Sequence, residues 1–337
     1  MAAVRGAVEE VRARVEEVRD RLAPDPRLAV FEVDVEVSGD AIALVGCTSE
    51  PDAAEELHRV VATLTGWREV RDELQLLPEC GPDEAVHAVV KTAVAPMLAG
   101  PAVRQTQVSQ AVLGMRLLVL RRERFWLQCR GSDGYIGWLH AGYVTLVDEQ
   151  DARAWDMGAD GDVWISLGAQ VLGDDGEVMA RLPWGARVVR DGTGLVRLPD
   201  SRVGVADGEL VPAGARALGF PSAGEAVCAT AVRWMGVPYL WGGVTMGGVD
   251  CSGFVQALYR LHGRVIPRDS DQQSRAGEAV ECGQDFCDLR PGDLLFFAEE
   301  PGRCSHVAMS TGGSRIIHAS LGNGGVARND MAGRRNY

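Results

Sequence analysis

The stretch Asp250-Cys251-Ser252-Gly253-Phe254 decides how the last third of the chain folds. Apolar residues recur after it at Leu258 and Leu261, four and three residues apart, which predicts a helix from about Ser252 to Leu261. Cys251 therefore lies at or beside a helix N-terminus, where free backbone N–H groups and the helix dipole favour a thiolate. The same N–H groups can bind a tetrahedral oxyanion. A single cysteine is more often a small buried hydrophobe, so this stretch needs a partner before it predicts chemistry.

Two histidines further along the chain supply that partner. Residues 305–310 are typical of a strand, residues 311–314 of a hairpin turn and residues 315–318 of the return strand. Folding the chain at this turn brings His306 nearly opposite His318. A cysteine at a helix N-terminus and two histidines on neighbouring strands match the nucleophile, base and orienting group of covalent catalysis.

Five stretches between residues 222 and 330 resemble the NlpC/P60 cysteine peptidases, which are papain-like enzymes that cut bacterial cell-wall peptides. In the order typical of that family, they are Pro238-Tyr-Leu-Trp-Gly-Gly243, Asp250-Cys-Ser-Gly-Phe254, Leu289-Arg-Pro-Gly-Asp-Leu294, Ser305-His-Val307 and Ile317-His-Ala319. The resemblance implies a papain-like catalytic domain over residues 220–337, within a chain of the α+β multidomain class.

The resemblance also implies a catalytic role for four residues. Cys251 would be the nucleophile, and His306 would be the general base and then the acid that protonates the leaving amine. His318 would hold the second ring nitrogen of that base and so fix its tautomer and orientation. Tyr239 would donate its phenolic O–H to the oxyanion, beside a backbone N–H of the Cys251 turn.

Five further residues are implied to contact substrate. Asp250 and Ser252 would line the pocket for an N-terminal L-Ala-γ-D-Glu, because a carboxylate suits a free ammonium group. Trp241 would form a wall of that pocket, and Tyr135 would close it from a neighbouring domain. Arg268 could meet a substrate carboxylate, although the start of a helix explains its stretch equally well. Such a site would reject N-acylated wall strands.

Residues 100–212 contain an internal repeat of short strands separated by Gly and Asp turns. The stretch Gly137 to Val144 in the first copy matches Gly204 to Val211 in the second. This pattern predicts two small barrels of five or six strands, at 100–149 and 160–212. Residues 132–139 resemble the conserved corner of bacterial SH3 domains, and Tyr135, which follows Asp-Gly at a turn, is predicted to be exposed.

The two SH3-like copies make the chain similar, within the family, to γ-D-glutamyl-L-diamino-acid endopeptidases that recycle imported wall peptides. In such relatives an acidic residue near Gly114 is expected as a second ligand of the substrate amine. Met115 stands there instead. Either another acid such as Glu123 replaces it, or recognition of the amine is weaker.

The pattern of apolar and turn residues over residues 1–80 predicts a small α/β domain. An apolar stripe from Val4 to Leu22 indicates a helix, which two prolines end. Strands at 30–37 and 42–45, a helix at 51–64 and a strand at 67–77 follow. The pattern loosely resembles the BON-type domains of bacterial envelope proteins, and an accessory or oligomerisation role is equally well supported. A linker helix is predicted over residues 81–99.

The composition of the chain disfavours some classes of binding partner and favours one cellular compartment. With 34 basic and 47 acidic residues the net charge is −13, which disfavours nucleic acid and anionic membranes. No apolar run approaches the ~18 residues of a membrane span, and the N-terminus lacks a signal-peptide pattern. Eight scattered cysteines without a Cys-x-x-Cys pair predict a cytoplasmic protein with reduced thiols. Their spacing favours no metal site, and no cofactor is expected.

The leading hypothesis is a cytoplasmic cysteine endopeptidase of peptidoglycan recycling. It would hydrolyse the bond from γ-D-Glu to an L-diamino acid in murein tripeptides or tetrapeptides with a free N-terminal L-Ala. One alternative is a wall-binding SH3 module with a vestigial cysteine site, and another is an amidase or acyltransferase on the same scaffold. The sequence leaves open the oligomeric state and whether the third residue is diaminopimelate or lysine.

Overall fold

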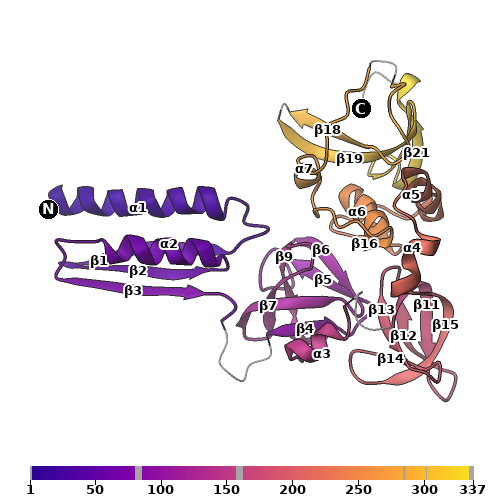
Figure 1. Cartoon of the computed structure of the whole chain (residues 1–337), viewed down its shortest axis with the longest axis horizontal. Coiled ribbons are helices and arrows are strands. Elements are labelled where there is room, and N and C mark those ends of the chain that lie inside the picture. Colours follow the sequence, from indigo (N-terminus) through magenta and orange to yellow (C-terminus); the bar gives the residue numbers. More distant parts are fainter. Residues whose placement is uncertain (1, 80–85, 157–161, 284–285, 301, 334–337) are drawn as a thin grey trace.

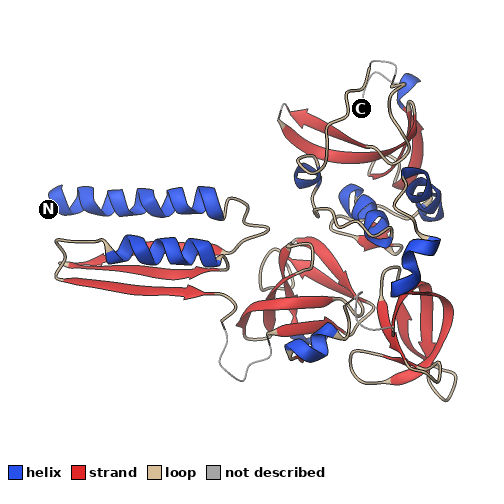
Figure 2. Ribbon diagram, viewed as in Figure 1, coloured by secondary structure: helices blue, strands red, loops and turns tan. Residues whose placement is uncertain are grey.

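The computed structural model describes residues 2–79, 86–156, 162–283, 286–300 and 302–333. Figure 1 shows four units in chain order: a two-layer N-terminal unit, two β-barrels and a C-terminal unit. Both end units combine helices with a sheet, whereas the two barrels between them consist mainly of strands (Figure 2). Among the described residues, no helix is both long and apolar enough to cross a membrane.

The N-terminal unit is a three-stranded sheet packed against two helices. Its elements have the predicted order and are α1 (Ala2–Leu22), β1 (Phe31–Ser38), β2 (Ala41–Thr48), α2 (Pro51–Ala62) and β3 (Glu69–Leu76). Strand β2 pairs antiparallel with β1 and parallel with β3. The stripe of α1 buries Val11, Val15 and Val18 in the core of the unit, as its spacing predicts. The side chain of Val4 lies outside the described residues.

The first barrel contains a seven-stranded sheet in the described part of the chain. Its strands are β4 (His87–Val90), β5 (Val94–Leu98), β6 (Gln107–Val112), β7 (Arg116–Glu123), β8 (Trp126–Arg130), β9 (Ile136–His140) and β10 (Val144–Val147). The 3-10 helix η1 (Ala141–Tyr143) precedes the last strand, and helix α3 (Glu149–Arg153) follows it.

The linker helix predicted over residues 81–99 is wrong, because residues 87–98 form two strands of the first barrel. Strand β4 lies between β10 and β7, and all four of its residues are buried. A short apolar run that is buried on both sides lacks the alternation that distinguishes a strand from a buried helix. Pro96 lies in β5, and inside a helix it would have removed a backbone hydrogen bond. Residues 81–85 lie outside the described part of the chain.

The second barrel is a five-stranded sheet closed by its longest strands. Its strands are β11 (Val163–Leu172), β12 (Val178–Leu182), β13 (Arg187–Arg190), β14 (Val196–Arg197) and β15 (Val203–Pro212). Strand β11 pairs with β12 and β13 and also with β15, which closes the barrel. Leu113 of the first barrel lies in the apolar core of the second, beside Val171 and Val188. The two barrels therefore share buried surface.

The C-terminal unit packs helices against a four-stranded antiparallel sheet. Its helices are α4 (Arg216–Gly219), α5 (Gly224–Ala231), α6 (Cys251–Leu261) and α7 (Ser270–Gln273), with 3-10 helices η2 (Ala213–Ala215), η3 (Val232–Trp234) and η4 (Met331–Gly333). Its strands are the short pair β16 (Val244–Thr245) and β17 (Gly248–Val249), and the sheet β18 (Leu294–Glu300), β19 (Arg303–Gly312), β20 (Arg315–Ser320) and β21 (Gly325–Asp330). Phe254 and Leu258 of α6 pack against Val307 and Ile317 of the sheet.

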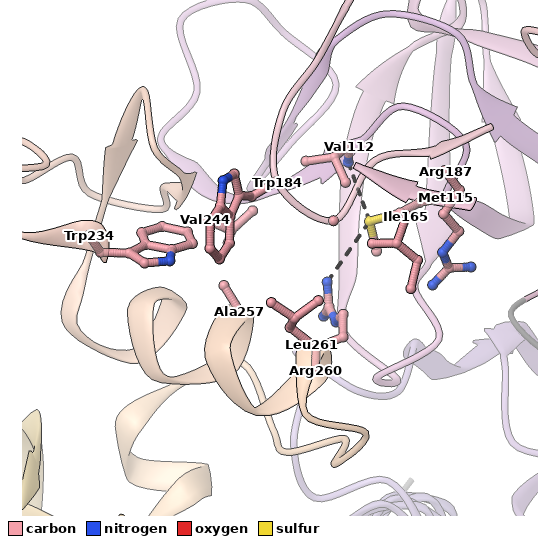
Figure 3. A pocket seen from close by; sticks show the side chains of 11 residues that line it. Val112, Met115, Ile165, Trp184, Arg187, Trp234, Val244, Ala257, Arg260 and Leu261 are labelled. Carbon is pink, nitrogen blue, oxygen red and sulfur yellow. Dashed lines mark hydrogen bonds between the residues drawn. The ribbon is translucent and has the colours of Figure 1, made fainter. Parts of the chain in front are cut away.

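Both barrels contact the C-terminal unit around helix α6. Trp184 of the second barrel meets Trp234 edge to face, with ring centroids 5.6 Å apart. Figure 3 shows the small pocket at this junction, where the sulfur of Met115 lies between the backbone nitrogen of Val112 and the guanidinium of Arg260. Met115 is thus buried against a cation of α6. An acid at this position would face Arg260.

Candidate active site

Helix α6 begins at Cys251, as the spacing of its apolar residues predicts. Asp250 is its N-cap and accepts a hydrogen bond from the backbone N–H of Gly253 at 2.6 Å. A Cβ at Gly253 would lie 2.2 Å from the carbonyl oxygen of Gly243, so the tight packing of this turn requires glycine. Cys251 is 7% exposed and lies in the core between α6 and the sheet.

The Cys251 thiol is protonated at neutral pH, contrary to the thiolate that its place at a helix N-terminus predicted. Burial, followed by the charge of Asp250, raises the pKa of Cys251 to about 11. The backbone N–H groups of Val307 and Ser252 oppose this rise but do not overcome it. The helix dipole is too weak to offset both desolvation and a neighbouring carboxylate. A thiol in this state can act as a nucleophile only if a base takes its proton during attack.

Strands β19 and β20 bring His306 and His318 into contact, as the predicted hairpin requires. Nε2 of His306 lies 2.7 Å from Nδ1 of His318, and Nε2 of His318 lies 3.0 Å from Oδ1 of Asn329. The amide oxygen of Asn329 places the His318 proton on Nε2, so Nδ1 of His318 accepts from Nε2 of His306. This assignment leaves Nδ1 of His306 as a free lone pair.

The third member of this hydrogen-bonded chain, Asn329, was not found from the sequence. It lies on β21, which pairs with β20 and so places Asn329 beside His318. Nδ2 of Asn323 lies 3.2 Å from Nε2 of His318, but both groups carry protons in this arrangement. Asn323 instead donates to Oδ1 of Asn329 at 2.8 Å and holds that oxygen in place. Recognising residues 325–330 as a further strand would have indicated this role.

The imidazole of His306 is uncharged at neutral pH. Burial, with a smaller contribution from His318, lowers the pKa of His306 to about 4. The backbone N–H of Val307, the next residue of β19, hydrogen-bonds the sulfur of Cys251, so His306 lies one residue along the strand from that contact. Successive side chains of a strand point to opposite faces of its sheet: Val307 packs in the core with Cys251, whereas the His306 ring packs against Phe297 and His318. Within the described part of the chain, no hydrogen bond joins the sulfur of Cys251 to the imidazole of His306. A cavity of about 340 Å³ opens beside both imidazoles and is lined also by Phe297, Glu299 and Asn323.

Tyr239 lies against the same core as Cys251 and is half-buried. Its backbone is held by a hydrogen bond to the carbonyl of Gly324 at 3.0 Å and by a bridge to Val249. Burial and then the charge of Cys251 raise the pKa of Tyr239 to about 12, so the phenol keeps its proton and can donate it. Trp241 is 63% exposed, and its carbonyl accepts a hydrogen bond from Gln107 of the first barrel.

Arg268 is 1% exposed and already bound within the chain, which disagrees with its predicted contact with a substrate carboxylate. Its Nη2 lies 2.7 Å from Oδ2 of Asp250, Nη1 lies 2.9 Å from Oγ of Ser252, and Nε lies 3.0 Å from Oγ of Ser109. Asp250 also accepts from the backbone N–H of Gly242 at 2.8 Å. Both neighbours of Cys251 are thus held by one buried guanidinium, and neither carboxylate oxygen of Asp250 is left free.

Tyr135 is buried rather than exposed as predicted, because its turn is covered by two other units. It is 4% exposed, and its hydroxyl donates to Oδ2 of Asp269 at 3.0 Å. Asp269 follows Arg268 and precedes α7, and burial raises its pKa. Its cationic partner is Arg27 of the N-terminal unit, at 2.9 Å. Sequence reasoning singled out neither Asp269 nor Arg27, because no local pattern joins residues 242 positions apart.

Glu123, the acid proposed to replace the residue at Met115, lies exposed at the end of β7. It is close enough to Arg121 to influence the charge of that side chain, and Arg121 binds Glu32 of the N-terminal unit at 2.6 Å. Tyr135 instead faces Asp269, so the carboxylate nearest to the predicted closing residue is one that the sequence did not single out.

A cysteine at the N-terminus of a helix that packs against an antiparallel sheet bearing a histidine and its polar partners defines a papain-like thiol hydrolase. Residues 236–335 match the model of the NlpC/P60 family, and residues 97–142 match that of the bacterial dipeptidyl-peptidase Sh3 domain. Residues 236–335 therefore form an NlpC/P60 domain.

Three comparisons show how far the similarity extends. The γ-D-glutamyl-L-lysine dipeptidyl-peptidase of Bacillus subtilis (strain 168) is 40% identical over 97 residues, which are 28% of this chain and 31% of that protein. Dipeptidyl-peptidase 6 of Lysinibacillus sphaericus is 28% identical over 268 residues, 73% of this chain and 92% of that protein. The crystal structure of an NlpC/P60 family protein from Bacillus cereus ATCC 10987 has a TM-score of 0.62 at 22% identity and covers 74% of this chain and 96% of that one. The matched region thus spans about a third of the first relative, whereas the last structure shows a shared fold.

Proposed function

We propose that this protein is a cysteine peptidase that hydrolyses the bond from γ-D-Glu to an L-diamino acid in cell-wall peptides. The observation that carries the proposal is the chain His306–His318–Asn329, which leaves Nδ1 of His306 free on the strand that contacts Cys251. The printed name of the Bacillus subtilis relative, a γ-D-glutamyl-L-lysine dipeptidyl-peptidase, supports this bond as the target.

The reaction proceeds through a thioester. As the sulfur of Cys251 attacks the γ-carbonyl carbon of D-Glu, Nδ1 of His306 takes the thiol proton, and the carbonyl oxygen becomes an oxyanion. Tyr239 and the N–H groups of the first turn of α6 donate hydrogen bonds to that oxyanion. His306 then protonates the leaving amine of the diamino acid. Water, deprotonated by His306, hydrolyses the thioester and restores the thiol.

The substrate's N-terminal ammonium is proposed to bind at Asp269. Asp250 was expected to fill this role, but Arg268 and two backbone N–H groups already occupy its oxygens. Asp269 carries the neighbouring carboxylate, and Tyr135 of the first barrel holds it. A carboxylate with a hydroxyl donor beside it suits an ammonium group of a peptide such as L-Ala-γ-D-Glu-X. The first barrel then closes the site instead of binding the wall.

The small size of such a substrate supports a role in recycling soluble wall peptides, and a cytoplasmic location is part of the same proposal. The test is mass spectrometry after incubating the full chain with L-Ala-γ-D-Glu-diaminopimelate and L-Ala-γ-D-Glu-L-Lys, each with and without an N-acetyl group. We expect release of the diamino acid and of the intact dipeptide. Cys251→Ala is the matched control for chemical release.

Each outcome separates the alternatives. Cleavage of acetylated and free peptides alike would keep the peptidase and discard recognition of the amine. Products that retain the mass of an acyl acceptor would indicate acyl transfer. No product, with retention of the chain on insoluble peptidoglycan, would favour the wall-binding module with a vestigial cysteine site.

A further inference from the structure

The loop between α1 and β1 inserts a guanidinium between the first barrel and α7. Nη1 of Arg27 lies 2.9 Å from Oδ2 of Asp269 and 2.7 Å from Oδ1 of Asp271. Its Nη2 lies 2.8 Å from Oδ2 of Asp271 and 2.8 Å from Oδ2 of Asp25, and its Nε lies 2.9 Å from Oδ1 of Asp25. One side chain of the N-terminal unit thus binds three carboxylates, two of them in the catalytic domain.

The backbone of this loop is fixed on both sides. The carbonyl of Arg27 accepts from the N–H of Ile136, the residue after Tyr135, at 2.7 Å. The carbonyl of Leu28 accepts from Arg130 at 3.0 Å, and Gln272 of α7 donates to Asp25 at 2.8 Å. The guanidinium is therefore placed by three separate units. Its side chain is still 34% exposed, so a solute can reach it.

Arg27 and Tyr135 donate to the same oxygen of Asp269. This is the oxygen at which the proposed function places the substrate's ammonium. The charge of the neighbouring Arg268 also acts on Asp269, but its guanidinium donates its hydrogen bonds to Asp250 and Ser252. In the free enzyme Arg27 therefore stands where the substrate's cation is expected. Without it, the cations left near these carboxylates would be Arg275, which is 3.2 Å from Asp271, and Arg268, whose charge acts on Asp269.

We propose that Arg27 is a built-in competitor for the substrate's N-terminal ammonium, so that the N-terminal unit sets how strongly amine-terminated peptides bind. This inference rests on the proposed function, in that it takes Asp269 as the ammonium site. The guanidinium leaves Asp269 when an ammonium arrives and stays bound to Asp25 and Asp271. Peptides without a free amine cannot displace the Arg27 guanidinium. Their affinity should therefore not increase when Arg27 is removed.

The test is calorimetric titration of the full chain with the dipeptide L-Ala-γ-D-Glu and with its N-acetylated form, which requires no catalysis. We expect Arg27→Ala to tighten binding of the free dipeptide about tenfold, as when the binding-competent state was about 10% populated, and to leave the acetylated form unchanged. Arg27→Lys keeps a cation and should retain most of the competition. Arg21→Ala is the matched control, because Arg21 binds Glu56 within the N-terminal unit.

A second variant separates competition from loosening of the interface. Arg121→Ala breaks the contact with Glu32, which joins the N-terminal unit to the first barrel, without touching Asp269. If Arg121→Ala tightens binding as much as Arg27→Ala, the inference is overturned, as it is if Arg27→Ala weakens both dipeptides or changes neither. If the wild-type chain fails to cleave the tripeptides while Arg27→Ala still gains affinity for the free amine, the proposed reaction fails and the competition stands.

Discussion

Two regions flank the N-terminus of α6, and they differ in charge. On the side of the sheet, Cys251 and His306 are both uncharged at neutral pH, because burial raises the pKa of the thiol and lowers that of the imidazole. On the opposite side, Asp250 and Asp269 are each paired with an arginine. Under the proposed function, the comparison teaches that proton transfer, which benefits from a dry and neutral site, is separated from substrate binding, which uses fixed charges.

The two ion pairs themselves differ in burial. The Asp250–Arg268 pair lies within one domain and is almost inaccessible, whereas the Asp269–Arg27 pair joins two units and remains partly exposed. A buried pair cannot exchange partners with solutes, so it serves to position Cys251. A partly exposed pair can exchange, which makes it suited to recognition. The predictions below test this division, from the largest effect to the smallest.

Replacing the proposed nucleophile should have the largest effect. We expect Cys251→Ala to lower kcat by at least ~10⁴-fold with little change in the free energy of unfolding, as for removal of a covalent nucleophile. Cys282→Ala, at an exposed cysteine, is the control and should keep full activity. Turnover by Cys251→Ala within tenfold of wild type would show that the neutral side of the site does not carry the chemistry.

Breaking the buried Asp250–Arg268 pair should lower the free energy of unfolding. Arg268→Met leaves the Asp250 carboxylate buried without its cation, and we expect a loss of about 3–5 kcal/mol in urea unfolding. Asp250→Asn added to it should recover part of that loss, because asparagine can still cap α6. Arg153→Ala, which breaks an exposed pair with Glu149, should cost far less. Equal costs for both arginines would contradict a positioning role for Arg268.

The neutral base should show in the pH profile. Because burial lowers the pKa of His306 to about 4, the imidazole stays unprotonated down to pH 5, and kcat/KM should fall less than twofold between pH 7 and pH 5.5. A base with an ordinary pKa of ~6.5 would lose about tenfold at pH 5.5. A tenfold loss in this range would mean that His306 is charged in the resting enzyme.

The same residue links pH to folding. Its pKa is lower in the folded chain than the ~6.5 of the unfolded chain, so unfolding takes up a proton and stability falls as the pH drops from 6.5 towards 4. The difference amounts to about 3 kcal/mol over this range. His306→Gln should flatten this part of the stability curve, as measured by urea unfolding at several pH values.

Sequence patterns predicted the parts of this molecule that local rules determine. The start of α6 at Cys251, the β19–β20 hairpin and the stripe of α1 follow from apolar spacing and turn residues. Sequence patterns failed where long-range packing determines the secondary structure or the pKa. The strand β4 has no alternation because both faces are covered, and the thiol pKa depends on burial and on Asp250 as well as on the helix end.

The residues predicted to contact substrate show the same limit of sequence-based prediction even more clearly. The predicted set of Asp250, Ser252 and Arg268 is close in space, but the three side chains bind one another. The proposed function therefore assigns recognition to Asp269, whose partners Tyr135 and Arg27 come from two other units. Only the assembled fold shows which carboxylate is already paired within its own domain.

The smallest predicted effect tests the exposed pair through its neutral partner. Tyr135→Phe removes a hydroxyl that is 3.0 Å from Asp269 but keeps the ring that fills the interface. One hydrogen bond to a charged group is worth about 1–2 kcal/mol, so KM for the free-amine tripeptide should rise about five- to twentyfold. The kcat should stay within twofold, because the hydroxyl contacts neither Cys251 nor His306. Tyr143→Phe, in η1 of the same barrel, is the control. A fall in kcat with unchanged KM would place Tyr135 on the chemical side of α6 and remove the division between the two regions.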